Sequence, residues 1–317
     1  MKNLTIYINR IYIMISGNLK HSSLSYLLLA ALIMSCNESD FLEEVPLDFY
    51  SPENSYVSQE QFNAAIIGLH KDYRDNFWGS ANVNQSPQMM FSGTDMIMND
   101  KDMGENPPDY VSVLLPTSNR VKYVWVEAYG IIYNANVIIA RADAENSQLS
   151  EAQSNLVKGE AMFFRALGYN MLANLYGGVP IVLEETSSPK RDYVRATRTQ
   201  VYEQCALDLE FAATNLPDIS SVEDHRVSKE TANHLLSQVY ISLERWTDAI
   251  DAATKVIDHS ATDLMTSRFG TRMNDTNFGG DVYWDLFRQG NQNRSAGNTE
   301  ALWVLQFEHQ VTGGGDL

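Results

Sequence analysis

Basic residues and cysteines are both scarce in this sequence. Lysine and arginine number 23 against 40 aspartate and glutamate residues in 317 positions, which gives a formal net charge of −17. Binding to nucleic acid needs clustered lysine and arginine that displace counterions from phosphates, so this charge disfavours nucleic acid as a partner. The two cysteines, Cys36 and Cys205, allow at most one disulfide.

The motifs of common catalytic and metal sites are also missing. The sequence has no glycine-rich phosphate loop, HExxH, CxxC or GxSxG, and none of its six histidines pairs with a second ligand at metal spacing. Glu184 and Glu185 could be assigned to a glycosidase, which needs two carboxyl groups about 5–9 Å apart. Among 40 acidic residues, however, some such pair is always present. We therefore predict no catalytic residue, no metal site, no cofactor and no enzymatic activity.

The apolar run near the N-terminus is too short for a transmembrane helix. Residues 26–34 form nine consecutive apolar positions, whereas a helix that crosses a bilayer needs about 20. Lys20 precedes the run, and Ser35 and Cys36 follow it, in the order typical of a secretory signal peptide. A cysteine directly after the small residue is typical of a bacterial lipobox, in which the thiol is acylated. A plain signal peptide with a chance cysteine is the alternative.

These features divide the chain into three parts. Residues 1–35 are the predicted signal peptide, and Met14 is an alternative start because residues 1–13 add an apolar patch that a signal peptide does not need. Residues 36–55 form a tether with five acidic residues in the twelve positions after Cys36. The acids are interpreted either as an address for the outer cell face or as a solvated leader. Residues 56–317 form the folded domain.

Helical periodicity dominates this domain. Phe62, Ile66, Leu69 and Tyr73, for example, fall on one face of a 3.6-residue repeat. Serine or threonine followed three positions later by glutamine predicts capping boxes at 58, 150 and 197. The predicted helices cover residues 58–73, 118–142, 150–176, 197–215, 228–243 and 246–259. The last two are joined by a very short turn and resemble a tetratricopeptide unit.

Two long segments, 78–116 and 261–300, read as loops, and residues 301–308 (ALWVLQFE) read as a short strand. Long loops inside a domain are often functional. Aromatic rings can cover the apolar face of a sugar while amide and charged side chains bond its hydroxyl rim. The ligand-binding candidates are Trp78, Asn82 and Tyr110 in the first loop and Trp284, Phe287 and Arg288 in the second. Alternatively, Trp78 and Trp284 anchor the loops on the helical core.

Several segments resemble the SusD/RagB family, the starch-utilisation-type lipoproteins of Bacteroidetes. Residues 158–182, KGEAMFFRALGYNMLANLYGGVPIV, are similar to a helix of that family that ends in LYGGVPL. Residues 125–143, 201–217 and 297–307 resemble further family segments in the same order. The family's helical motifs are scaffold, and its ligand contacts follow no fixed motif, so the resemblance transfers no binding residue.

The resemblance implies a mainly α fold with tetratricopeptide-like helix pairs, long ligand-binding loops and minor β structure. It also implies a lipid anchor at Cys36 in the cell outer membrane, on the exterior face, and a partner, a SusC-like TonB-dependent transporter. Family members generally continue well beyond 317 residues, so residues 56–317 are expected to lack a C-terminal part. The implied function is binding and delivery of a glycan. Binding of peptides or another non-sugar nutrient, a surface hydrolase and a helical-repeat scaffold are the alternatives.

Overall fold

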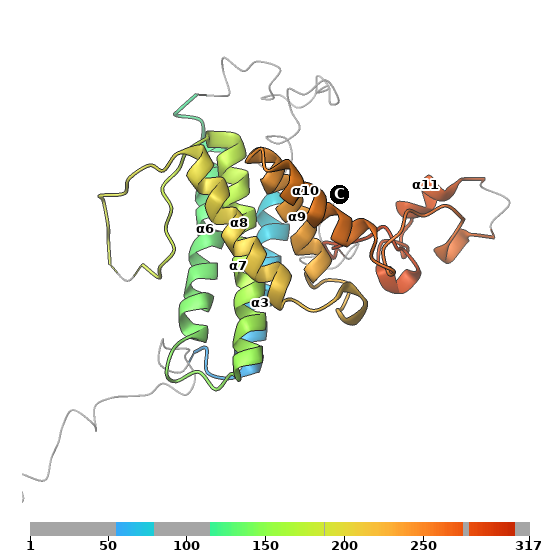
Figure 1. Cartoon of the computed structure of the whole chain (residues 1–317), viewed down its shortest axis with the longest axis horizontal. Coiled ribbons are helices and arrows are strands. Elements are labelled where there is room, and N and C mark those ends of the chain that lie inside the picture. The colour runs from blue at the N-terminus through green and yellow to red at the C-terminus, as the bar shows by residue number, and fades with distance from the viewer. Residues whose placement is uncertain (1–54, 79–114, 187, 275–278, 308–317) are drawn as a thin grey trace, which may run out of the picture. The chain divides into compact units, whose positions relative to one another are not determined.

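The computed structural model describes residues 55–78, 115–186, 188–274 and 279–307. The predicted signal peptide, Cys36, the tether to residue 54, Asn82 and Tyr110 lie outside these ranges. Within them no helix is both long and apolar enough to cross a membrane. The described α-helices (Figure 1) are α3 (Gln59–Phe77), α6 (Asn119–Ala142), α7 (Glu151–Tyr176), α8 (Arg198–Asn215), α9 (Lys229–Ser242), α10 (Trp246–Ile257) and α11 (Val282–Leu286).

The six predicted helices are present, and α3 extends one turn beyond Tyr73. Their starts follow from local side-chain bonds. At the start of α7 the backbone N–H of Ser150 donates to Oε1 of Gln153 at 2.8 Å, and the backbone N–H of Gln153 donates to Oγ of Ser150 at 3.4 Å. Thr197 and Gln200 form the same reciprocal pair before α8. Each box satisfies amides that the first helical turn leaves without a partner.

Helix α7 lies at the centre of the described helices, between α6 and α8, and α9 packs on α8. The predicted apolar face of α3 is buried, as are large side chains of α7 such as Phe164 and Leu172. Gly168 permits a close approach of α6, because a Cβ there would lie 3.0 Å from Ile132 and 3.3 Å from the carbonyl oxygen of Ala128. The core therefore depends on small residues at the helix contacts as well as on large apolar ones.

A buried ion pair crosses this apolar core. Arg165 of α7 donates from Nε and Nη2 to the two carboxylate oxygens of Asp208 on α8, at 2.8 and 2.7 Å. Its Nη1 donates to Oδ1 of Asn136 on α6 at 2.9 Å, so one guanidinium links three helices. Burial raises the pKa of the Asp208 carboxyl, and the hydrogen bonds from Arg165 oppose that rise.

Helices α9 and α10 form the predicted short helical hairpin. Ala249 and Ala252 of α10 are buried on the side that packs against α9. The turn between the helices passes through Glu244 at φ +58°, and the guanidinium of Arg245 lies 4.3 Å from the ring centroid of Tyr240. The described helices thus confirm the predicted mainly α fold with a tetratricopeptide-like helix pair.

The predicted strand at 301–308 is wrong for the residues that are described. Positions 301–307 carry no strand, and the β structure in the described part is a single isolated bridge between Pro180 and Arg195. Instead, the Trp303 ring stacks on Tyr73 with centroids 5.6 Å apart, and its Nε1 donates to the carbonyl of His225 at 3.1 Å. An apolar, β-prone sequence here serves to dock an extended segment on the helices.

We expect Arg165→Met to lower the free energy of unfolding by about 3–5 kcal/mol, because it leaves the Asp208 carboxylate buried without its counter-charge. Lys71→Met is the matched control, since it removes an exposed pair with Asp75 that is worth about 0–1 kcal/mol. Combining Arg165→Met with Asp208→Leu should recover much of the loss. Urea unfolding followed by circular dichroism measures all three variants. Equal stability of Arg165→Met and Lys71→Met would contradict this account.

Candidate functional site

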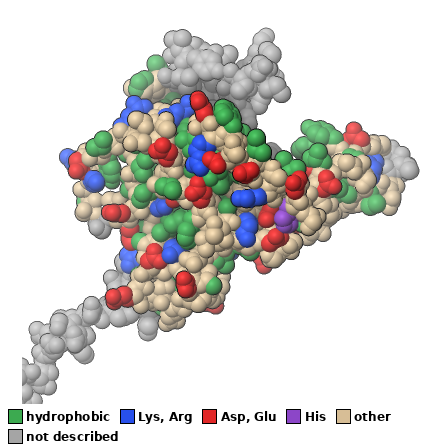
Figure 2. All heavy atoms as spheres, in the orientation of Figure 1, with side chains coloured by type: hydrophobic (Ala, Val, Ile, Leu, Met, Phe, Trp, Pro, Cys, Tyr) green, Lys and Arg blue, Asp and Glu red, His purple; other side chains and the backbone are tan. Residues whose placement is uncertain are grey.

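Two aromatic rings project from the short helix α11, within the second predicted loop. Tyr283 and Phe287 are four positions apart and therefore lie on one side of the helix. Both side chains are 69% exposed, and their ring centroids are 5.0 Å apart. We call these two residues the α11 ring pair. Figure 2 shows hydrophobic surface over this part of the chain.

Trp284 and Arg288, two of the predicted ligand residues, contact each other. The guanidinium carbon of Arg288 lies 3.3 Å from the centroid of the Trp284 ring, and Nε of Arg288 is buried without a hydrogen-bond partner among the described residues. A Cβ on Gly280, whose φ is +110°, would overlap the Trp284 ring. The half-buried Trp284 ring is thus covered by the protein's own groups, and the adjacent ring pair offers the open aromatic surface.

Polar side chains, rather than apolar ones, hold α11 in place. Asp285 is completely buried and accepts from Nη2 of Arg268 at 3.1 Å and from the backbone N–H of Phe269 at 3.3 Å. Asn291, also completely buried, donates to the backbone carbonyl of Asp285 at 3.0 Å and accepts from the N–H of Thr271 at 2.8 Å. Hydrogen bonds from Arg268 hold the pKa of the Asp285 carboxyl below its ordinary value, so this group is an anion that fixes the loop.

The sequence predicted only some of the residues that lie together at α11. The structure brings Trp284, Phe287 and Arg288 together on α11, and Trp78 is exposed where α3 ends. The other two predicted contacts, Asn82 and Tyr110, are not described. Tyr283 was not among the predicted ligand residues. Its spacing of four from Phe287 was the available signal, but a helix of five residues is too short to show a helical period.

A second aromatic surface lines a cavity of about 630 Å³ between α6 and residues 180–195. Trp125, Tyr129 and Tyr133 follow each other at intervals of four along α6, and Tyr193 contributes from the opposite side. The cavity volume is within the range of about 300–1,000 Å³ found for small-molecule pockets. The spacing of four between these aromatic residues in the sequence is typical of one helical face, but it gives no sign that this face borders a cavity.

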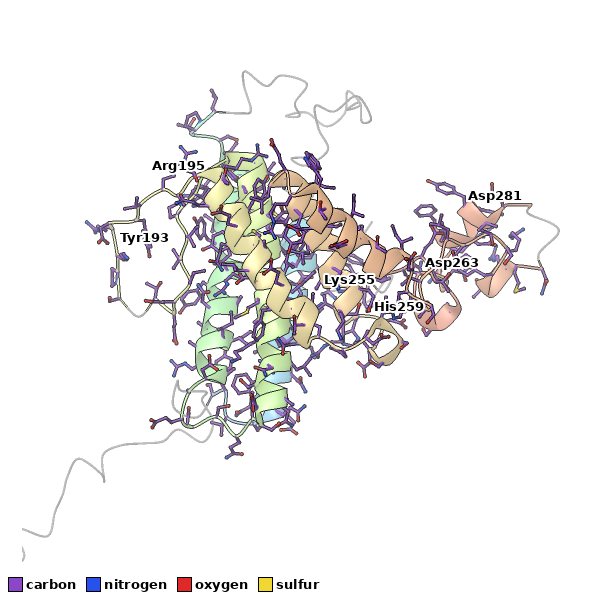
Figure 3. All side chains as sticks on the ribbon, viewed as in Figure 1. Tyr193, Arg195, Lys255, His259, Asp263 and Asp281 are labelled. Carbon is purple, nitrogen blue, oxygen red and sulfur yellow. The ribbon has the colours of Figure 1, made fainter. Side chains whose placement is uncertain are left out.

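Asp218, Glu230 and His259 form the one group in the described ranges with metal-ligand chemistry. Nε2 of His259, which lies where α10 ends (Figure 3), is 2.9 Å from Oδ2 of Asp218 and 3.7 Å from Oε1 of Glu230. Its Nδ1 accepts from the backbone N–H of Ala261 at 3.2 Å, which places the ring hydrogen on Nε2, toward the carboxylates. A metal-bound histidine instead donates from its second nitrogen. The group is therefore a hydrogen-bonded cluster.

Comparison with known proteins identifies the relatives of this chain. Residues 40–241 match the family described as "Starch-binding associating with outer membrane" (SusD-like_3). The chain is 25% identical to SusD-like protein P25 of Formosa agariphila over 302 residues, which are 91% of this chain and 52% of that protein. SusD-like protein P2 of the same organism is 26% identical, with 94% and 55% covered. The chain spans about half the length of these relatives.

Solved structures share the fold. A SusD-like carbohydrate-binding protein of Bacteroides fragilis superposes with a TM-score of 0.61 at 19% identity, over 82% of this chain and 51% of that chain. A SusD superfamily protein of Bacteroides thetaiotaomicron gives 0.58 at 21% identity, with 82% and 55% covered. A laminarin-binding SusD-like protein gives 0.52 at 23% identity, with 63% and 44% covered.

We expect Asp285→Ala to loosen the α11 segment while the helical core stays intact. The substitution removes the acceptor of both the Arg268 guanidinium and the Phe269 amide. Hydrogen exchange should therefore accelerate at the amides of Phe269 and Thr271, with little change in α7. Folding lowers the pKa of the Asp285 carboxyl below its ordinary value of 3.8. Its ionisation therefore stabilises the folded segment fully above pH 3.8, and this contribution is lost only as the pH falls below that value. Unchanged exchange at both amides would contradict the bracing role of Asp285.

Proposed function

Because the chain belongs to the SusD-like family of starch-binding proteins associated with the outer membrane, we propose that it captures oligosaccharides at the cell surface. The α11 ring pair is the observation that carries this proposal. Two large rings that are 69% exposed, on a helix fixed by buried polar bonds, provide a preformed aromatic surface. A sugar ring presents an apolar C–H face that such a surface covers on binding.

Polar groups beside the ring pair complete the chemistry that a glycan requires. Gln289 and Gln292 are exposed two and five positions after Phe287, while Arg288 covers the Trp284 ring and the Asn293 amide is bonded to Gln306. Amide groups donate and accept hydrogen bonds at sugar hydroxyls. One structural neighbour is described as a laminarin-binding SusD-like protein, so β-glucan oligosaccharides are a suitable first ligand class to test.

The proposed cellular role is delivery of the captured glycan to a SusC-like TonB-dependent transporter. The lipobox-like sequence at Ser35–Cys36 supports a lipid anchor, and the family description supports association with the outer membrane. We propose that the anchored protein faces the cell exterior, where the acidic tether up to residue 55 separates the binding domain from the membrane.

The protein is proposed to bind its ligand without cleaving it. Glycoside hydrolysis needs two carboxyl groups that flank the scissile bond, one of them able to donate a proton. On α11 the carboxylate of Asp285 is buried and held by Arg268, and that of Asp281 accepts the hydrogen bond of the helix cap. The described α11 segment therefore offers one exposed carboxylate, that of Asp281, rather than the pair that hydrolysis requires.

Tyr283→Ala and Phe287→Ala should each weaken glycan binding about tenfold or more, since fully burying one large apolar side chain contributes about 1.5–3 kcal/mol. The melting temperature should stay unchanged, because both rings are exposed. Trp246→Ala, which removes an exposed ring from α10, is the matched control and should leave affinity intact. Isothermal titration with laminarin and malto-oligosaccharides measures the effect.

Two outcomes of these titrations would count against the proposal. The first is that no oligosaccharide of the panel binds the wild-type protein. The second is that the α11 variants bind as tightly as Trp246→Ala. The same preparations should release no reducing ends from the bound glycan, and release that rises with protein concentration would identify an enzyme.

Cys36→Ala should transfer the protein from the membrane fraction to the soluble fraction. Stable anchoring takes at least two acyl chains, each contributing about 0.8 kcal/mol per buried CH₂. Cys205→Ala is the control and should remain with the membranes, because Cys205 is buried between helices. Fractionation after a high-salt wash, followed by immunoblotting, distinguishes the two. A Cys36→Ala protein that still sediments with membranes would show that the anchor lies elsewhere.

A further inference from the structure

The segment between α7 and α8, residues 180–195, leaves the helical core and returns to it. We call it the excursion. Its base is fixed by the bridge between Pro180 and Arg195 and by the bond from Nη2 of Arg195 to the carbonyl of Tyr176 at 3.0 Å. The carbonyl of Val182 accepts from the hydroxyl of Tyr169 at 2.8 Å. Figure 3 shows Arg195 at this base and Tyr193 on the outer part of the excursion.

The polar groups at the floor of the cavity between α6 and the excursion are bonded to the protein itself. Asn136 lies there, but its amide nitrogen donates to the carbonyl of Val182 at 2.9 Å and its oxygen accepts from Arg165 at 2.9 Å. The hydroxyl of Tyr129 donates to the carbonyl of Pro180 at 2.7 Å. These polar groups are occupied by the protein itself, so the floor offers ring and aliphatic surface to a ligand.

The aromatic side chains at the mouth of the cavity remain partly exposed, although the Lys190 ammonium lies 5.4 Å from the centroid of the Tyr193 ring. Tyr133 is 46% exposed and Tyr193 is 43% exposed, and Val194 beside Tyr193 is also exposed. Side chains that served only to pack the excursion on α6 would be buried between the two. A patch of large exposed rings around an apolar cavity is typical of a binding surface.

The backbone of the excursion is also open to a partner. In the described part of the chain, the C=O groups of Thr186 and of residues 188–194 accept no hydrogen bond, and their N–H groups, which Pro189 lacks, donate none. Apart from the bridge at its base, the described part of the excursion pairs with no strand. An extended peptide can pair with such a backbone and place an alternate side chain in an adjacent pocket, the mode known as β-strand addition.

The charge at this site differs from that of the chain as a whole. No charged side chain lines the cavity. At its rim Lys190 and Arg191 are consecutive and exposed, and Asp192 follows them. The Lys190 ammonium lies 5.4 Å from the centroid of the Tyr193 ring, whereas Arg191 forms no ion pair with a described residue. An acidic group on a ligand would therefore find its complement beside the apolar cavity.

We propose that the excursion binds an extended segment of a partner protein, with a large apolar or aromatic side chain in the cavity and an acidic residue at Lys190–Arg191. The site is separate from the α11 ring pair and does not depend on the glycan function proposed above.

The test uses five blocked, fluorophore-labelled octapeptides with Phe, Tyr, Trp, Leu or Ala after a central Asp in a Ser/Thr/Val background. Fluorescence polarisation with the purified protein should give at least tenfold tighter binding for the best large side chain than for Ala. Tyr133→Ala and Tyr193→Ala should each weaken that binding at least tenfold, and Arg191→Glu about threefold or more. Trp246→Ala, which removes an exposed ring from α10, is the matched control and should have no effect.

Thermal melts separate loss of binding from loss of fold, and the half-exposed Tyr133 and Tyr193 should be replaceable without a shift. A copy of the best peptide with alternate N-methylated amides should lose binding, since it cannot pair with the excursion backbone. The proposal is overturned if all five peptides bind equally or not at all, or if the two tyrosine variants bind like wild type. Displacement of the peptide by laminarin oligosaccharides would overturn the peptide proposal and identify the cavity as a glycan site. If Tyr133→Ala loses peptide binding but keeps glycan binding, the two sites are independent and the α11 proposal stands.

Discussion

The buried pair of Arg165 and Asp208 is the interaction on which the described architecture depends. Two charges removed from water are tolerated only when their geometry and remaining hydrogen bonds are complete. Here the bidentate contact fixes α7 against α8, and the remaining guanidinium nitrogen reaches Asn136 on α6. Asn136 in turn donates to the carbonyl of Val182, so the base of the excursion is positioned by a chain of polar bonds that begins in the core.

The α11 segment is supported in a different way. The helical core excludes water from apolar side chains, whereas residues 268–274 and 279–291 are organised around the completely buried polar groups Asp285 and Asn291. Because polar bonds fix this loop, Tyr283 and Phe287 are not needed for packing and can remain at the surface. A site on a segment braced in this manner is preformed, which reduces the entropy lost when a ligand binds.

Sequence patterns predicted the parts of the fold that local physics determines. The six longer helices follow from apolar periodicity and from boxes such as Ser150 with Gln153, in which all partners lie within one turn. The strand expected at 301–308 was wrong because the position of Trp303 is set by Tyr73 and His225, which are distant in the sequence. For the same reason the cavity beside α6 was missed. Its far wall consists of residues such as Tyr193, which no periodicity connects to Trp125.

The two aromatic surfaces differ in the groups that remain available to a ligand, and this difference argues for different ligands. Beside the α11 ring pair, the exposed amide side chains of Gln289 and Gln292 follow the rings in the sequence, as recognition of a hydroxyl-rich ligand requires. In the cavity beside α6, the side chain of Asn136 and the hydroxyl of Tyr129 are already bonded, and the remaining polar groups are the excursion backbone and a few side-chain hydroxyls such as those of Thr186 and Ser188. The first arrangement suits a ring with many hydroxyls and the second suits an apolar side chain carried by a peptide. Since the two sites share no residue and rest on separate ion pairs, substitutions at one should leave the other intact.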